Sequence, residues 1–223
     1  MSSSKKLESV VLQIVKEFLE KKPFFSIEDI VVFVNNRVKR NPNLNKNSIE
    51  IIIKSLIKKR IIIPGTKLMR NNIIENPKRN EIFNFIKKNP NNINQIMKAL
   101  NLGSNHALWH LSCLEKFQFV RSKKINNQRV FFRFDSNPKF DELYYYLRIQ
   151  IVQKIIIFMK NEKKTLKITE IATGVKKNHN TVKKYLDILI DLKLINIEKE
   201  KNRIEYKLDQ DNYTKARQSI RGV

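Results

Sequence analysis

The sequence predicts a mainly α-helical protein in which small β-hairpins follow groups of helices. Three observations predict this fold class. Apolar residues recur at helical spacing through most of the chain, short extended runs interrupt that spacing, and one segment repeats another. Residues 93–120 align with residues 168–195 without a gap, so each residue of the first copy corresponds to the residue 75 positions later.

Each copy begins with three helices. In the earlier copy, apolar residues predict a first helix around residues 82–86 and a second over residues 93–100. A tight connection through Gly103 leads to a third helix, for which Ser104 is the expected N-cap. Apolar residues at i, i+4 and i+7 define the inward face of this third helix: Ala107, Leu111 and Leu114.

Two short extended runs follow each third helix. In the earlier copy they cover residues 119–123 and 129–134, and the Asn126–Asn127 pair between them is typical of a tight hairpin turn. The later copy repeats the pattern, with a turn at residues 200–202. Three helices followed by a two-stranded hairpin form a winged helix-turn-helix arrangement, in which the hairpin is the wing.

A weaker third copy occupies the N-terminal part of the chain. An amphipathic helix over residues 11–18 precedes a second helix, which Ser26 should cap and which should reach residue 40. This second helix is expected to be about eight residues longer than its counterparts. A third helix covers residues 49–56, and the Pro64-Gly65 turn after it leaves room for only a short wing.

The fold prediction is therefore mainly α with small β-hairpin wings, arranged as three tandem winged helix-turn-helix domains. The expected boundaries are 1–72 for an N-terminal winged-helix-like domain, 73–136 for a middle winged-helix domain, 137–152 for a connector helix, 153–208 for a C-terminal winged-helix domain and 209–223 for a basic tail.

The connector has an aromatic character. Three consecutive tyrosines, 144–146, begin a helix that is expected to run without a break from residue 141 to residue 160. Its aromatic face suits either packing between neighbouring domains or a dimer interface, and the sequence leaves both open. The tail has only weak helical character.

The charge of the chain points to a polyanionic partner. The 223 residues carry 45 Lys and Arg against 21 Asp and Glu, a net charge of +24, spread as +9, +7 and +8 over residues 1–72, 73–136 and 137–223. Charge of this size predicts salt-sensitive attraction to nucleic acid or to anionic surfaces. No secretory or membrane-spanning segment is visible, so a cytoplasmic, nucleoid-associated protein without a membrane partner is expected.

Composition also argues against an enzyme. Four glycines leave no room for a phosphate-binding loop, and the single Cys113 excludes a disulfide framework and an all-cysteine zinc site. His106, His110 and Cys113 are spaced so that they could share one side of a helix, as soft metal ligands would. The set has no acidic member and no fourth ligand in the sequence. His110 lies near the buried face of the helix, and Cys113 is expected to be an ordinary small apolar residue. We expect neither a metal nor a cofactor.

The outward faces of the third helices supply candidate DNA-binding residues. Asn can bond adenine through two hydrogen bonds, Lys can reach guanine or phosphate, and a side chain at a helix N-terminus can lie beside a phosphate. The candidates are Ser104, Asn105, His106 and Trp109 in the middle domain and Asn178, His179, Asn180, Thr181, Lys183 and Lys184 in the C-terminal domain.

The wings add candidates that could contact phosphates or the minor groove. These are Arg121, Lys123, Lys124 and Arg129 in the middle wing and Lys201 and Arg203 in the last. Acidic residues lower the net positive charge of the last wing, so the middle domain is expected to bind DNA more tightly. In the first domain, Ile51 lies on the outward face of the third helix, where a DNA-binding residue would be expected. An apolar residue there suggests that this face packs against a neighbour.

Residues 71–90, 105–123 and 130–134 resemble the archaeal winged-helix transcriptional regulators related to the ArsR and MarR groups. The signature of that family at the end of the third helix here reads Trp109-His110-Leu111, Leu114-Glu115 and Phe119-Val120. Gln118 stands where the family usually has Gly, and Trp109 stands where Tyr is usual. The resemblance implies tandem winged-helix domains.

The leading hypothesis is a DNA-binding transcriptional regulator that uses its third helices and basic wings, with double-stranded DNA as its partner. Pairing with a second copy or with transcription-associated proteins stays open. One alternative is a winged-helix scaffold or protein-interaction subunit of a larger complex, which Ile51 favours for residues 1–70. Another is a sequence-indifferent chromatin or RNA binder, which the same charge would serve.

Overall fold

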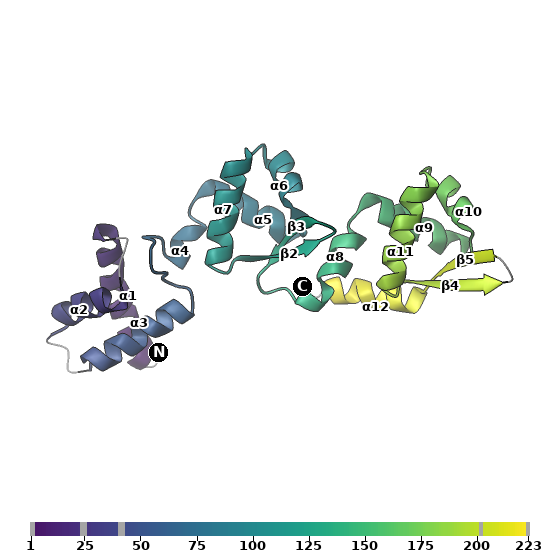
Figure 1. The fold of residues 1–223 in the computed structure, drawn as a ribbon. Helices are drawn as coiled ribbons and strands as arrows, with labels where there is room; N and C mark the ends of the chain where they lie inside the picture. Colours follow the sequence, from purple (N-terminus) through teal and green to yellow (C-terminus); the bar gives the residue numbers. More distant parts are fainter. Residues whose placement is uncertain (1–2, 23–25, 40–42, 201–202, 222–223) are drawn as a thin grey trace. The chain divides into compact units, whose positions relative to one another are not determined.

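The computed structural model describes residues 3–22, 26–39, 43–200 and 203–221 (Figure 1). This part of the chain is mainly helical with small antiparallel sheets, as the sequence predicts. Two compact units are present, residues 1–88 with 92–123 and residues 89–91 with 124–223, and the division falls within strand β2. None of the described helices is long and apolar enough to span a membrane.

The first group of helices comprises α1 (Ser3–Lys21), α2 (Ile27–Arg37) and α3 (Lys46–Lys58). Their apolar faces share one core, in which Val15 and Ile53 are fully buried. The extended segment after α3 forms only an isolated antiparallel bridge between Ile62 and Met69, so any wing here is as short as the sequence predicts.

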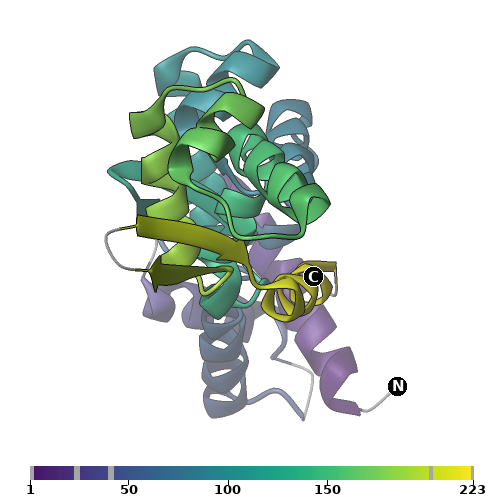
Figure 2. The same ribbon diagram turned by 90° about the vertical axis from the view of Figure 1, so that its right-hand side faces the viewer.

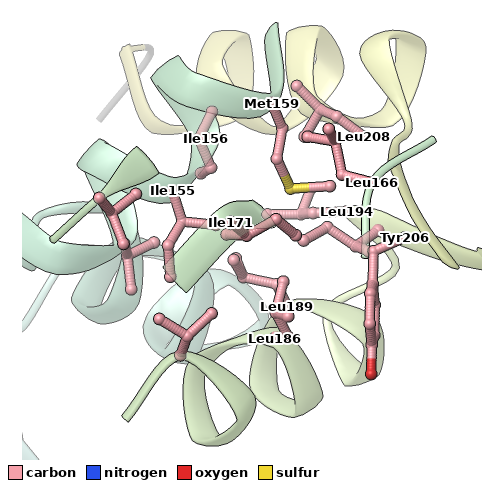
Figure 3. Close-up of a cluster of buried hydrophobic side chains, with 14 of the residues drawn as sticks. Ile155, Ile156, Met159, Leu166, Ile171, Leu186, Leu189, Leu194, Tyr206 and Leu208 are labelled. Carbon is pink, nitrogen blue, oxygen red and sulfur yellow. The ribbon is translucent and has the colours of Figure 1, made fainter. Parts of the chain in front are cut away.

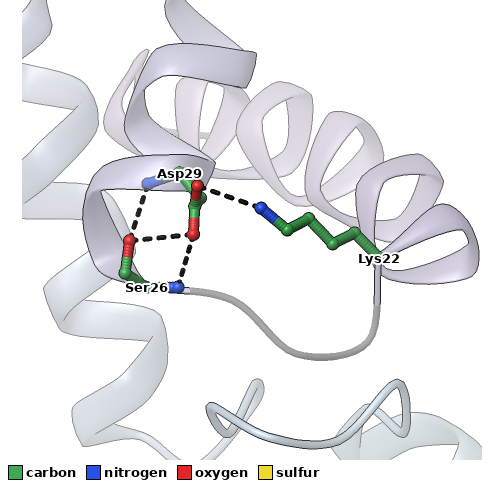
Figure 4. A network of polar contacts seen from close by, with 3 residues as sticks. All are labelled: Lys22, Ser26 and Asp29. Atoms are coloured by element: carbon green, nitrogen blue, oxygen red, sulfur yellow. Dashed lines mark hydrogen bonds and ion pairs between the residues drawn. The ribbon is translucent and has the colours of Figure 1, made fainter.

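The start of α2 carries the predicted cap. Ser26 Oγ accepts a hydrogen bond from the Asp29 N–H, and Asp29 Oδ2 accepts one from the Ser26 N–H, at 3.1 and 2.8 Å (Figure 4). The bonds from Ser26, with a further one from Lys22 Nζ, lower the pKa of Asp29 to about 2. This confirms Ser26 as the N-cap.

The end of α2 differs from the prediction. The helix has 11 residues against 8 in α6 (Ile93–Leu100), so the expected excess of about eight residues is wrong. Val38 leaves the helical conformation as the C-cap but is still buried. The apolar spacing therefore continues past the helix end, which is why the sequence overestimated its length.

The second group of elements follows the predicted order, with the hairpin completing a three-stranded sheet of order β1-β3-β2. Asn126 and Asn127 at the hairpin turn have φ values of 44° and 60°, which confirms the tight turn. The elements are α4 (Arg70–Ile73), α5 (Pro77–Lys88), β1 (Asn91–Asn92), α6, α7 (Ser104–Lys116), β2 (Val120–Ile125) and β3 (Gln128–Arg133).

The start of α7 corrects one expectation. Ser104 is the first residue of the helix, and the N-cap is Gly103, which has extended backbone and no side chain to accept a hydrogen bond. The chain enters the helix one residue earlier than a serine cap would require. The corresponding residue of α11 (His179–Asp191) is Asn178, whose Oδ1 accepts the Thr181 N–H at 2.7 Å.

The three helices α3, α7 and α11 end in the same backbone motif. In each, the N–H two residues past the C-cap bonds to the carbonyl five residues earlier, at 2.9 Å. This is a Schellman motif, which needs left-handed backbone and usually has Gly there because a Cβ is crowded in that conformation. The left-handed residues here, with φ of 54–58°, are Arg60, Gln118 and Lys193.

The connector is broken where one continuous helix was predicted. A short 3-10 turn, η1 (Pro138–Phe140), leads into α8 (Asp141–Leu147), and α9 (Gln150–Glu162) begins after an interruption. Ile149 has extended backbone at this interruption, and Gln153 Nε2 donates to the Leu147 carbonyl. Neither Pro nor Gly marks the break, so helical periodicity passes through it undetected.

The last group contains α9, α10 (Ile168–Gly174), α11, β4 (Ile195–Glu200), β5 (Arg203–Leu208) and α12 (Gln210–Arg221). The antiparallel hairpin pairs Ile195 with Leu208, and Figure 2 shows the two strands side by side, with β5 leading into α12. The weakly helical tail is thus a helix, and its Ala216 packs on the core formed by α9, α10 and α11. Figure 3 shows this core, with Ile155 of α9, Ile171 of α10 and Leu186 of α11 pointing into it.

Candidate nucleic-acid interface

Helix α7 has one buried and one exposed face. Ala107, Leu111 and Leu114 are buried, as their spacing predicts. The predicted binding residues on the other face are exposed: Ser104, Asn105, His106 and Trp109. Trp109 is 55% exposed, and Leu108 beside it, which sequence reasoning missed, is 40% exposed. This face of α7 therefore combines polar groups with an aromatic and an aliphatic side chain.

A buried arginine lies behind the exposed tryptophan. Arg79 of α5 is only 5% exposed, and its guanidinium carbon lies 5.6 Å from the centre of the Trp109 ring, within cation–π range. Its Nε and Nη1 have no hydrogen-bond partner within the described ranges. Sequence reasoning missed Arg79, although the repeat offers a signal: aligning Ile82 with Ile155 places Arg79 opposite Val152, a core position.

His110 belongs to the same cluster. Its ring lies 4.8 Å from that of Trp109 at an interplanar angle of 69°, and the residue is buried, as expected for a core histidine. Burial lowers the pKa of His110 below its usual 6.5, and the nearby positive charge of Arg79 lowers it further. The imidazole is therefore held neutral near pH 7, which keeps a second cation out of this part of the core.

The exposed face of α11 is cationic. His179, Asn180, Lys183 and Lys184 are exposed and Thr181 is half-buried, while Val182, Leu186 and Leu189 face the core. Lys184 Nζ lies 5.9 Å from the centre of the Tyr185 ring. Asn178 is also exposed, but its side-chain Oδ1 accepts the Thr181 N–H as the helix cap, so its NH₂ group is the part of the amide that can still donate to a ligand.

The middle hairpin keeps most of its predicted cations at the surface. Lys123, Lys124 and Arg129 are exposed, and Arg121 is half-buried. The Arg129 guanidinium lies 5.1 Å from the centre of the Phe131 ring, so an aromatic side chain holds that cation. This hairpin presents positive charge along both strands.

The last hairpin has mixed charge. Arg203 is exposed, whereas Lys201 lies outside the described residues. Glu198 and Glu205 face each other across β4 and β5, where Lys207 Nζ lies 3.7 Å from Glu198 and Thr165 Oγ1 donates to Glu205 at 2.6 Å. These carboxylates reduce the positive electrostatic potential with which the hairpin would attract phosphate.

The outward face of α3 differs from both others. Ile51 is 68% exposed there, as its position predicts, beside an ion pair in which Lys54 Nζ lies 2.7 Å from Glu50. An exposed isoleucine and a neutralised lysine make this face less suited to a polyanion than that of α11.

Potential metal ligands do not converge in the described part of the chain. No group of three or more His, Cys, Asp or Glu side chains there is placed to hold a metal ion. His106 is exposed, His110 is buried and Cys113 is half-buried, so the helical spacing of these residues distributes them between surface and core.

Comparison with known proteins found a distant archaeal relative. The chain is 25% identical over 203 residues to a protein named "Uncharacterized HTH-type transcriptional regulator MJ1398", from Methanocaldococcus jannaschii. The match covers 90% of this chain and 51% of that protein, so the chain spans about half the length of this relative. No protein-family model matches the chain.

Among solved structures, the crystal structure of the bacterial selenocysteine-specific elongation factor EF-Sec is similar with 13% sequence identity and a TM-score of 0.29. The match covers 93% of this chain and 30% of that chain. At this TM-score the similarity supports no inference about fold or function.

Proposed function

We propose that the chain is a DNA-binding transcriptional regulator built from tandem winged helix-turn-helix domains, in which α7 and α11 enter the major groove. One observation carries the proposal: the outward faces of these two helices expose matched positions 75 residues apart, such as Asn105 and Asn180, opposite buried apolar faces. In a helix-turn-helix, these N-terminal outward residues are the ones that reach base edges.

The side chains suggest a division of roles. Asn105 and Asn180 suit bidentate bonds to adenine, and Lys183 suits guanine or phosphate. Trp109 offers an apolar surface for a thymine methyl group. Ser104 and His179 lie in the first turns of α7 and α11, where phosphate binds favourably.

The net charge of the chain and its similarity to an archaeal protein support the same proposal. The net charge of +24 and the exposed cations of the β2–β3 hairpin would provide the salt-sensitive part of the affinity. The similar archaeal protein is named as an HTH-type transcriptional regulator, and we extend that description to this chain as a role in binding DNA rather than in catalysis. Because the match spans only half of that relative, its other half implies nothing here.

Titration of a labelled duplex at several salt concentrations tests the proposal. Lys124→Ala and Lys183→Ala should each weaken binding and reduce the slope of log affinity against log salt by about one, because each removes one phosphate contact. Lys154→Ala is the matched control, since Lys154 is exposed on α9 and its loss changes net charge equally. Absence of binding at about 150 mM salt, or equal weakening by all three changes, would contradict the proposal.

A second role, protein interaction, fits residues 1–70. The exposed Ile51 of α3 and the 47% exposed Val32 of α2 favour a protein partner for this region rather than DNA. If so, Ile51→Lys leaves duplex affinity unchanged or slightly raised while abolishing association with the protein partner. If Ile51→Lys instead raises affinity strongly, α3 already lies against DNA.

A further inference from the structure

A second candidate site lies in the C-terminal unit, where the end of α9, the end of β5 and the start of α12 meet. A cavity of about 390 Å³ opens there, a volume within the range of small-molecule sites. It is lined by Met159, Lys160, Lys163, Lys164, Lys207, Leu208 and Gln210.

The lining combines an apolar floor with a cationic rim. Met159 and Leu208 are buried side chains of the core and form the floor, whereas the four lysines are exposed. Gln210 adds an amide, and no Asp or Glu is among the lining residues. A site of this composition suits a molecule that carries both negative charge and an apolar group.

The end of a helix does not by itself explain these lysines. Lysines at the C-terminus of α9 do offset the helix dipole. However, Lys207 comes from β5 and Gln210 from α12, so the lining converges from three elements. Four like charges around one cavity repel each other, and a bound anion would relieve that repulsion.

Neighbouring carboxylates neutralise the rim only in part. Lys164 Nζ lies 4.0 Å from Glu162 and 3.8 Å from Glu170, and Lys207 has the 3.7 Å pair with Glu198. Exposed pairs at these distances are weak. Lys160 and Lys163 form no ion pair with the parts of the chain that the structure describes, so their charge is available to a ligand.

The cavity lies on a different side of the C-terminal core from α11. In Figure 3, Met159 and Leu208 lie at the opposite edge of the core from Leu186 and Leu189 of α11. The lysines of the cavity therefore do not extend the exposed face of α11.

We propose that this cavity binds a small organic anion, with a phosphate or carboxylate group among the lysines and an apolar group over Met159 and Leu208. The proposal does not depend on the proposed DNA binding, because the site uses other residues.

Titration of the full chain with phenyl phosphate, followed by NMR and calorimetry, tests the proposal. Saturable 1:1 binding is expected, and the double variant Lys160→Gln/Lys163→Gln should weaken it at least about tenfold. The matched control is Lys139→Gln/Lys154→Gln, which removes the same charge from exposed positions outside the cavity and outside the candidate DNA-binding residues, and should leave affinity unchanged.

Two further ligands separate the contribution of the lysines to binding from that of the apolar floor. Inorganic phosphate lacks the apolar group and benzyl alcohol lacks the charge, so both should bind more weakly than phenyl phosphate. Equal weakening in the two double variants would mean diffuse charge attraction and overturn the proposal. It is also overturned if either of these simpler ligands binds as tightly as phenyl phosphate.

Discussion

The two repeats place different chemistry on one backbone plan. Helices α7 and α11 each have 13 residues, end in the same Schellman motif and bury corresponding apolar positions. Their outward faces differ, because Trp109 of α7 corresponds to Lys184 of α11. The comparison teaches that the inward positions of both repeats keep the apolar side chains that build the core, while the outward positions have diverged in chemistry.

The interiors also differ in charge at one aligned position. Arg79 in the middle repeat and Val152 in the C-terminal repeat occupy corresponding core sites, and both are buried. Val152 fills its site with apolar contacts. Arg79 buries a charge against Trp109, and two of its nitrogens find no hydrogen-bond partner among the residues that the structure describes. The arginine is therefore a cost to stability that the other repeat avoids.

Exchanging these residues gives the largest expected effects. Val152→Arg should lower the free energy of unfolding by at least about 3 kcal/mol, because it buries an unpaired charge at a fully enclosed position. Urea unfolding followed by far-UV circular dichroism measures this loss. A loss below about 1 kcal/mol would show that the arginine side chain at position 152 can still place its guanidinium in water.

The reverse exchange, Arg79→Met, should raise stability by about 1–3 kcal/mol, because a hydrophobic side chain of similar length replaces a desolvated charge. The fluorescence of Trp109, the single tryptophan of the chain, reports the unfolding of this repeat. Destabilisation instead would mean that the guanidinium has partners that outweigh its burial.

The two outward faces should respond differently to salt. Lys184→Ala should weaken duplex binding and lower the salt slope by about one, whereas Trp109→Ala should cost about 1–2 kcal/mol at its preferred base with little change in slope. Duplex titrations at several salt concentrations separate the two effects. Equal changes in slope would contradict the prediction that α11 contributes a charged contact and α7 an apolar one.

The pH dependence of the middle repeat should follow His110. Its pKa in the folded protein is lowered, so the unfolded state binds the proton more readily and stability falls as pH drops below the usual histidine value of about 6.5. Removing the charge in Arg79→Met should move the pKa of His110 back toward that value. NMR titration of the imidazole measures both, and an unmoved pKa in the variant would exclude Arg79 as a cause.

The smallest effects are expected at the helix ends. Gln118→Gly and Lys193→Gly should each stabilise the protein by up to about 1 kcal/mol, because Gly adopts left-handed backbone without a crowded Cβ. Gly103→Asn should add a few tenths of a kcal/mol by supplying the cap that Asn178 already gives α11. Thermal unfolding of the three variants checks the order of these gains.

Much of the fold was predictable because apolar spacing directly encodes buried faces. The third helices, the hairpin turn at Asn126–Asn127 and the Ser26 cap all follow from local rules. The break at Ile149 and the end of α2 at Val38 did not, because apolar spacing continues through both points and neither residue is Pro or Gly. The ends of α7 and α11 were not predictable either. Gln118 and Lys193 occupy the left-handed positions at which Gly usually marks the end of a helix.

The candidate site was predictable only in part. Exposure of Asn105, Trp109 and Lys183 follows from the helical face opposite the apolar residues. Burial of Arg79 does not, since Arg is almost never fully buried without a partner and only alignment with Val152 hints at it. The lysines of the cavity come from three elements, so no single stretch of sequence reveals them.

Selection of bound duplexes from a random-sequence pool at about 150 mM salt tests the central proposal most directly. We predict recovery of a defined motif by the intact chain and loss of its information at adenine positions in Asn105→Ala and Asn180→Ala, with overall affinity only modestly lowered. Salt-sensitive binding without enrichment of any motif would contradict the proposal that α7 and α11 read sequence.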